Sequence, residues 1–230
     1  MLTNLAARNG ISASIIGRGT TPQRPIDSHN FIGSIEQMGA VMSFTRNSEI
    51  FVEGEPADYL YKVISGAVRT YTVLSDGRRQ IGDFFLPAEI FGLETGENHA
   101  HSAEAISDAK ILVIKRSAVM ALAARDNAVA NELWALTGRQ LARVQSHILL
   151  LIKSAEERVA GFLLEMASRV QSNTEVQLPM SRHDIADYLG LTIETVSRTL
   201  TQLENSSAIA LLTSRRISLR DRKALTRLNA

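Results

Sequence analysis

The sequence predicts a mixed α+β chain, with a β-rich N-terminal half, a long helical segment, and a small C-terminal domain of short helices and a β-hairpin. Short runs rich in β-formers, among them LYKVI, AVRTYTVL, IGDFF and KILVI, alternate with turn signals up to residue 116. Strong helix formers then fill residues 117–170, where Gly138 and Gly161 are the only glycines and proline is absent. Short amphipathic and β-rich runs occupy the remaining chain.

Composition excludes several classes of site. The 230 residues include no cysteine, which rules out disulfides, thiolate zinc sites and cysteine-ligated iron–sulfur clusters. No apolar run approaches the roughly 20 residues of a membrane span, and the N-terminus lacks the apolar core of a signal peptide. We therefore expect a cytoplasmic protein with no membrane contact. The net charge is only +1, but the residues from Ser206 onwards include six basic residues and one acidic residue.

The β-rich part is expected to be one domain. Its turn signals are EG, SG and DG pairs that end at Gly54, Gly66 and Gly77. Together with the short strands they predict an antiparallel barrel or jelly roll over residues 31–116, which we expect to be a sensor-like domain. Residues 1–30 carry glycine and proline among polar residues without periodicity, so we expect a flexible N-terminal arm and assign it no function.

Residues 117–153 are expected to form a helical connection and a dimerisation helix. A seam with the three- and four-residue steps of a coiled coil consists of Trp134, Thr137, Leu141, Val144, Ile148 and Leu151. Such a seam can pack on the protein's own barrel or on a second copy of the helix. The run at residues 148–152 is apolar around more of the helix than one buried face requires, which favours a second copy. We therefore expect a homodimer interface that contains Trp134, Leu141, Val144, Ile148 and Leu151.

A third unit is expected over residues 154–230. Ser154 is followed three residues later by Glu157, the pattern of a capping box, so a new helix should begin there and place the domain boundary at this point. This unit carries most of the basic excess noted above.

Residues 181–204 hold the most specific motif. Ser181 and Asp184 repeat the start signal of a short helix, and Gly190 can take the left-handed conformation that ends it. Thr192 can cap a second helix after a turn of three or four residues. Two short helices joined in this way form a helix-turn-helix, whose second helix lies in the major groove of DNA.

The second helix should have one packing face and one reading face. At about 100° per residue, Glu194, Ser197, Arg198 and Thr201 share one face, while Val196, Leu200 and Leu203 share the other. Arginine can donate two hydrogen bonds to guanine, and glutamate can accept one from cytosine N4. An exposed ion pair between Glu194 and Arg198, four residues apart, would explain the same spacing.

A hairpin wing is expected after the second helix. Residues 209–212 and 216–219 are two short β-rich runs around a polar turn. We expect Arg215 and Arg216 of this wing to lie against DNA phosphates, which adds salt-dependent affinity without reading sequence.

Three segments carry a resemblance to a known family. The segment MSRHDIADYLGLTIETVSRTLTQLE resembles the helix-turn-helix of the Crp/Fnr regulators, and its ETVSR reading helix is similar to that of the Fnr and FixK branches. Upstream, IFVEGEPADYLYKVISGAVRTY and IGDFFLPAEIFGLE resemble the cyclic-nucleotide-binding-type barrel. The resemblance implies a cyclic-nucleotide-binding-type jelly roll, a long dimerisation helix and a C-terminal winged helix-turn-helix.

The resemblance also implies a function. It implies a homodimeric transcription regulator, usually an activator, that binds double-stranded DNA at a twofold-symmetric site with TTGA-like half-sites and contacts RNA polymerase. The base-reading positions are Glu194, Ser197, Arg198 and Ile193, the last against a thymine methyl. The backbone-contacting positions are Ser181, Arg182, Thr192 and Thr195. In Fnr-like proteins the neighbourhood of Arg78 and Arg79 can touch RNA polymerase; by its chemistry this loop is a plain hairpin turn.

Departures from the family pattern bear on what the barrel senses. Cyclic-nucleotide binders carry FGEL followed by R-[ST]-A, whereas this chain has FGLE at residues 91–94 and HSA at residues 101–103. A histidine at position 101 removes the always-charged bidentate phosphate clamp. Fnr itself uses cysteine ligands, which are absent here. What remains resembles the FixK branch, which implies no cofactor, no small effector, and genes for low-oxygen respiration and nitrogen fixation.

Two alternatives remain open. The segment GENHAHSAE resembles part of a cupin metal motif, which would make the protein a metal enzyme rather than a regulator. On a strand, however, His99 and His101 would point one way and Glu104 the other. The second alternative keeps a regulator whose barrel binds an unidentified effector, such as haem through His99, His101 or His147.

Overall fold

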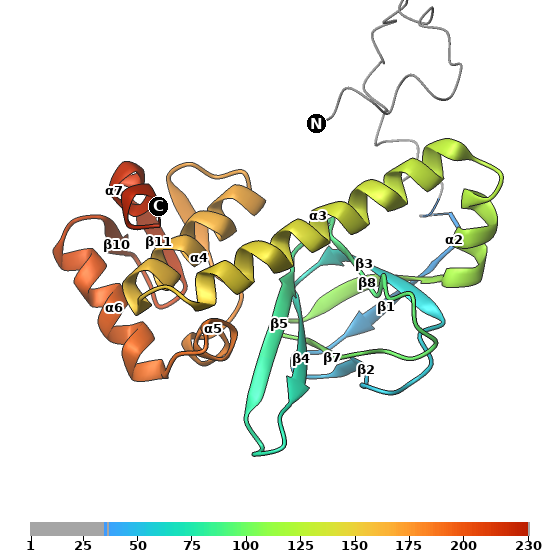
Figure 1. Cartoon of the computed structure of the whole chain (residues 1–230), viewed down its shortest axis with the longest axis horizontal. Coiled ribbons are helices and arrows are strands. Elements are labelled where there is room, and N and C mark those ends of the chain that lie inside the picture. Colours follow the sequence, from blue (N-terminus) through green and yellow to red (C-terminus); the bar gives the residue numbers. More distant parts are fainter. Residues whose placement is uncertain (1–34, 36, 230) are drawn as a thin grey trace, which may run out of the picture.

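The computed structural model describes Ile35 and residues 37–229, and it confirms the mixed α+β fold class (Figure 1). The predicted arm over residues 1–30 lies outside the described residues. A β-domain, a long helix and a C-terminal domain follow one another along the chain. No helix of the described part combines the length and apolarity that a membrane crossing requires.

The β-domain is a jelly roll, which in the described chain consists of two four-stranded sheets with the orders β1-β8-β3-β6 and β2-β7-β4-β5. All their pairings are antiparallel. The strands are β1 (Ala40–Phe44), β2 (Glu49–Phe51), β3 (Tyr59–Ser65), β4 (Val68–Val73), β5 (Arg79–Phe85), β6 (Ile90–Phe91), β7 (Ser102–Ala105) and β8 (Ala109–Lys115). Gly54, Gly66 and Gly77 all have positive φ angles, as the turn signals predict.

The helical segment is divided into α2 (Arg116–Ala123), α3 (Asn127–Leu151) and α4 (Ala155–Arg169). The sequence pattern alone does not show the break before α3, which the side chain of Asp126 stabilises by accepting a hydrogen bond from the Ala128 amide. The capping box of Ser154 and Glu157 is present at the start of α4. With 25 residues, α3 is about 38 Å long and reaches from the barrel to the C-terminal domain (Figure 1).

The C-terminal domain contains α4, the strand β9 (Glu175–Gln177), the helices α5 (Arg182–Leu189) and α6 (Ile193–Asn205), the strands β10 (Ile209–Leu211) and β11 (Arg216–Leu219), and α7 (Arg222–Leu228). The expected hairpin wing is β10–β11, and β9 adds a third antiparallel strand beside β11. Neither β9 nor α7 is predicted from the sequence, because both are short and take their stability from packing on neighbours.

The C-terminal domain and the barrel share an apolar core. Phe84 of β5 packs against Tyr188 of α5 and Phe162 of α4, with ring centroids 5.2 and 6.3 Å apart. Tyr188 also stacks on His147 of α3 at 4.0 Å. Side chains of β5, α3 and α4 therefore contact one buried tyrosine of α5, so the helix-turn-helix is packed on the barrel rather than attached through α3 alone.

Candidate nucleic-acid interface

The predicted helix-turn-helix consists of α5, α6 and a short turn. Ser181 and Asp184 form a reciprocal capping box at the start of α5. Gly190 ends that helix with φ 61° and ψ 40°, the left-handed conformation that the sequence analysis assigns to it. Thr192 then caps α6 by accepting a hydrogen bond from the Thr195 amide at 3.2 Å.

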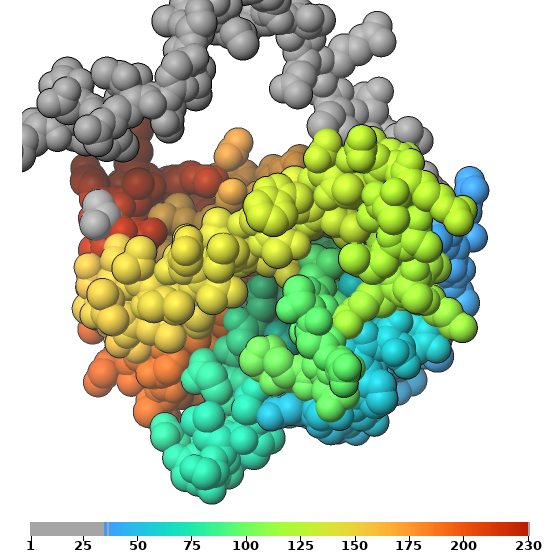
Figure 2. Space-filling view, turned by 45° about the vertical axis from the view of Figure 1, so that its right-hand side comes forward, coloured from blue at the N-terminus to red at the C-terminus, as the bar shows by residue number. Residues whose placement is uncertain are grey.

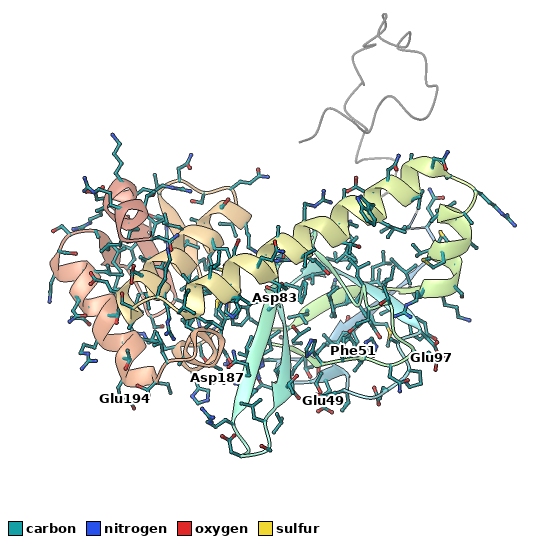
Figure 3. The ribbon with its side chains drawn as sticks, viewed as in Figure 1. Glu49, Phe51, Asp83, Glu97, Asp187 and Glu194 are labelled. Atoms are coloured by element: carbon teal, nitrogen blue, oxygen red, sulfur yellow. The ribbon has the colours of Figure 1, made fainter. Side chains whose placement is uncertain are left out.

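Helix α6 has the two expected faces. Its buried face contains Val196, Leu200 and Leu203, and it also contains Thr199, which is 3% exposed. These side chains pack in the core with α4 and α5. The opposite face presents Glu194, Arg198 and Thr201 to solvent. Figure 3 shows Glu194 at the free N-terminal end of α6, away from the rest of the protein.

The spacing of Glu194 and Arg198 left two interpretations open, a reading pair or an exposed ion pair. Within the described residues the two side chains form no ion pair with each other. Hydrogen bonds from its own backbone amide and from the Thr192 hydroxyl lower the pKa of Glu194. The carboxylate therefore stays ionised at neutral pH, as an acceptor for a cytosine amino group must be.

The other predicted DNA-contacting residues lie around the same end of α6. Ser197 is half-buried, and its hydroxyl accepts a hydrogen bond from Nη1 of Arg182 at 3.2 Å. This contact links the first turn of α5 to the reading helix. Ile193 is 38% exposed, and the hydroxyl groups of Thr192 and Thr195 lie 3.1 Å apart. The first turns of both helices thus bring these side chains together on one surface.

The wing carries the two predicted arginines. Arg216 is exposed and forms an ion pair with Glu175 of β9, with Nη2 and Oε2 2.6 Å apart. Arg215 lies in the β10–β11 turn, where the Thr213 side chain accepts a hydrogen bond from its backbone amide. An exposed pair of this kind contributes at most about 1 kcal/mol, so Arg216 can exchange Glu175 for a phosphate at little cost.

The side chains of Arg78 and Arg79, in the hairpin between β4 and β5, point in different directions. Arg78 is exposed and pairs with Asp76 on the same turn at 2.7 Å. Arg79 points the other way, toward α5, and donates hydrogen bonds to Asp187 from Nε at 3.0 Å and from Nη2 at 2.9 Å. Figure 3 shows Asp187 on α5 beside this hairpin. Sequence reasoning missed this contact, because the partners are 108 residues apart.

A cavity of about 480 Å³ lies between the barrel and α3. Phe91, Glu94 and His101 line it on the barrel side, and Gln140 and His147 line it on α3. Residues 91–94 and 101 line this cavity, and by the resemblance they correspond to the ribose- and phosphate-binding positions of cyclic-nucleotide binders, with histidine instead of arginine at residue 101. Burial lowers the pKa of His147, so its imidazole is neutral at pH 7.

The three candidate ligand histidines are dispersed. His99 is buried, stacks on Phe51 at 3.6 Å and places Nδ1 3.2 Å from Glu94. His101 is exposed and bonds the Thr72 hydroxyl at 2.9 Å. Both precede β7, whereas Glu104 lies on it, so the alternation of one continuous strand does not apply to these three residues. No group of three or more ligating side chains in the described chain could hold a metal ion.

The predicted dimerisation seam lies on the outer face of α3. Trp134 is 81% exposed, and Leu141, Val144 and Ile148 are about half exposed or more. Leu151 differs, because it is half-buried beside Gly190 and the cavity. Figure 2 shows α3 on the molecular surface along the path from the barrel to the C-terminal domain. This row of apolar side chains therefore has no partner within the described chain.

Comparisons with known proteins agree with this arrangement. Residues 41–126 match the cyclic nucleotide-binding domain, and residues 157–228 match the Crp-like helix-turn-helix domain. The nitrogen fixation regulation protein FixK of Azorhizobium caulinodans is 50% identical over 202 residues, which cover 85% of this chain and 82% of that protein. The FixK protein of Rhizobium meliloti is 43% identical over 186 residues, 80% of this chain and 85% of that protein.

A solved structure shows the same fold. The structure of FixK2 from Bradyrhizobium japonicum has a TM-score of 0.80 and 49% identity, and the match covers 84% of this chain and 98% of that one. The matched domains together span both the barrel and the helix-turn-helix, and the relatives extend over most of the chain. The chain belongs to the Crp/Fnr family of DNA-binding transcription regulators, in its FixK-like branch.

Proposed function

We propose that this regulator is a homodimeric activator that binds a palindromic TTGA-N6-TCAA-like site without a small effector. The observation that carries the proposal is the free N-terminal end of α6, where Glu194 and Arg198 are exposed and do not pair with each other. Two exposed groups of opposite charge that form no ion pair within the described part of the chain are suited to partners outside it. A G·C base pair supplies both partners, an acceptor pair on guanine and a donor on cytosine.

Each predicted contact then has a role in this complex. Arg198 donates to guanine O6 and N7, Glu194 accepts from cytosine N4, Ser197 contacts a neighbouring base edge, and Ile193 packs on a thymine methyl. The groups at the helix starts and in the wing hold the DNA backbone and fix the register. They are Ser181, Arg182, Thr192, Thr195, Arg215 and Arg216.

Dimerisation through α3 supplies the twofold symmetry. A palindromic site requires two reading helices related by a twofold axis. Trp134, Leu141, Val144 and Ile148 form the exposed row that a second α3 would cover, and Leu151 would contact it at the edge. Apolar side chains of this size are seldom left uncovered in a continuous row on one helix.

Independence from an effector is supported by the barrel residues. Glu94 belongs to the FGLE segment, which departs from the FGEL pattern of cyclic-nucleotide binders. Its Oε2 lies 3.2 Å from Nδ1 of His99. His101 stands where a phosphate-clamping arginine would be and bonds Thr72 instead. The cavity of about 480 Å³ favours a second candidate, a regulator with an unidentified effector, since it has room for a small ligand.

The biological role is proposed from the relatives. Two of them are nitrogen fixation regulation proteins, so we propose that this regulator controls genes for nitrogen fixation or low-oxygen respiration. It would act in the cytoplasm as a non-enzymatic protein and contact RNA polymerase, with the exposed Arg78 as one contact. Arg79 would add to that contact only at its exposed edge, because its guanidinium is held by α5.

The test is a titration of purified protein, without added ligand, onto a TTGA-N6-TCAA duplex and onto one with both G·C pairs changed. We expect a preference of at least about 100-fold, or about 2.7 kcal/mol. Arg198→Ala should lose most of it. Arg227→Ala is the matched control, because Arg227 is an exposed arginine on α7, away from the free end of α6 (Figure 1).

Two outcomes would contradict the proposal. Equal weak binding to both duplexes would contradict effector-free recognition of this site, and the appearance of a preference with an added cyclic nucleotide or haem would favour the second candidate. A preference that survives Arg198→Ala would remove Arg198 from the reading role. The salt concentration is held constant throughout, because phosphate contacts dominate the raw affinity.

A further inference from the structure

A buried arginine joins the barrel to the helix-turn-helix. Arg69 on β4 is 7% exposed, although its charge would favour the surface. Its Nη2 donates to both carboxylate oxygens of Glu104 on β7 at 2.8 Å. Its Nη1 donates to Oδ1 of Asp184 on α5 at 2.6 Å. One planar guanidinium thus bridges a strand of the barrel and a helix of the DNA-binding unit.

Asp184 is already committed to the start of α5. Its Oδ2 accepts hydrogen bonds from the Ser181 amide at 2.8 Å and from the Ser181 hydroxyl at 2.7 Å. Its Oδ1 accepts from Arg69 and, at 3.0 Å, from Nη2 of Arg79. A single carboxylate, 5% exposed, therefore caps the helix with one oxygen and fastens it to the barrel with the other.

The second arginine extends this link along α5. Arg79 donates to Asp184 and also to Asp187, which lies one turn later on the same helix face. Two donors and two acceptors at successive turns hold both the position and the rotation of α5. Since α5 packs on α6, a fixed α5 fixes the reading helix relative to the barrel.

We propose that Arg69 is the positioning residue that sets the orientation of the reading helix, and thereby the half-site spacing that the dimer accepts. The proposal rests on the homodimeric function proposed above. A ligand-dependent regulator leaves this orientation to its effector; here the Arg69–Asp184 ion pair fixes it at folding. The planar guanidinium of arginine suits this task because its five N–H donors lie in one plane at fixed angles.

The consequence concerns spacing rather than base choice. Each added base pair moves one half-site by about 3.4 Å and rotates it by about 35° relative to the other. Rigidly held reading helices match one spacer length and reject its neighbours. Helices that swivel on the barrel match several spacers with lower affinity for each, while Glu194 and Arg198 still recognise the same bases.

The test measures binding of the full chain to duplexes with TTGA and TCAA separated by five, six and seven base pairs. The wild-type protein should bind the duplex with the six-base-pair spacer more tightly than the one with seven. In Arg69→Gln this affinity ratio should be at least about tenfold smaller than in the wild type, or about 1.4 kcal/mol. The ratio between the six-base-pair duplex and its G·C-changed version should change less than about threefold. Arg46→Gln is the matched control, because Arg46 is an exposed arginine of the barrel, between β1 and β2, and has no role in the proposed function.

The outcomes separate this inference from the proposed function. Wild-type protein that shows no preference for the palindrome would overturn both. Wild-type preference for the six-base-pair spacer that Arg69→Gln retains in full would overturn only the positioning role. If Arg69→Gln fails to fold, Arg79→Gln decides, since its side chain is 25% exposed and its loss leaves Asp184 with Arg69. The same direction of change in the spacer ratio is then expected, and an unchanged ratio overturns the inference.

Discussion

Replacing Ile148 by alanine is expected to weaken self-association and leave the fold intact. Ile148 is 58% exposed in the single chain, on the outward face of α3. The substitution deletes three carbon groups, and the burial of each contributes about 0.8 kcal/mol. Because Ile148 is 58% exposed in the single chain, dimerisation can supply about 58% of this burial free energy. Each protomer therefore loses about 1.4 kcal/mol, and a twofold dimer loses about 2.8 kcal/mol. The dimer dissociation constant should rise about 100-fold.

Sedimentation equilibrium over a concentration series measures this constant directly. Met120→Ala on α2 is the matched control, because Met120 is also 58% exposed and apolar but is not part of the seam. Its dimer dissociation constant should stay within about twofold of the wild-type value. The reasoning is refuted if Ile148→Ala leaves the constant unchanged, or if both variants raise it equally, since neither result depends on a seam along α3.

Two predictions concern stability. Burial raises the pKa of Asp83 to about 6 against the opposing charges of Arg143 and Arg169, so the folded chain holds this proton more tightly than the unfolded chain. The contribution of Asp83 to stability is therefore greatest at low pH and falls between about pH 4 and 6. In urea titrations Asp83→Asn should be more stable than wild type at pH 7, by up to about 3 kcal/mol, and should lose this advantage toward pH 4. An advantage that is constant with pH would contradict the raised pKa of Asp83. Gly190→Ala should cost about 1 kcal/mol, because φ is 61° there and a new Cβ would meet only ordinary contacts. Its thermal midpoint should fall by about 2–4 °C, and an unchanged midpoint would mean that the turn relaxes.

Local signals explain why the helix-turn-helix is predictable. Ser181, Asp184, Gly190 and Thr192 each act within four residues of their own position, so the amide or carbonyl they serve can be read from the sequence. The buried face of α6 follows from periodicity in the same way. The added burial of Thr199 does not, because it depends on how closely α6 is packed and not on residue type.

Contacts between distant segments explain what the sequence could not show. Arg69 is one of several polar residues in a short strand, and nothing in its neighbours indicates a partner 115 residues away. Alternation along a regular strand would place His99 and His101 on one face, whereas the chain bends before β7 and the His99 ring is buried against Phe51. Periodicity assumes that an element is regular, and bends and ion pairs between domains depend on the assembled fold.

The way α5 is packed bears on the proposed independence from an effector. To change a two-state equilibrium from 1:99 to 99:1, a ligand must favour one state by about 5.5 kcal/mol. A bistable regulator therefore needs an interface that is weak enough to be rearranged by that amount. Here α5 is held by Tyr188 in the shared core and by Asp184 in a buried ion pair, and removing one partner from such a pair costs about 3–5 kcal/mol. Both contacts would have to break together for α6 to move away from the barrel, which disfavours a rearrangement driven by a small ligand in the adjacent cavity. On this reasoning the barrel acts as a rigid mount for α6, as the proposed effector-free regulator requires.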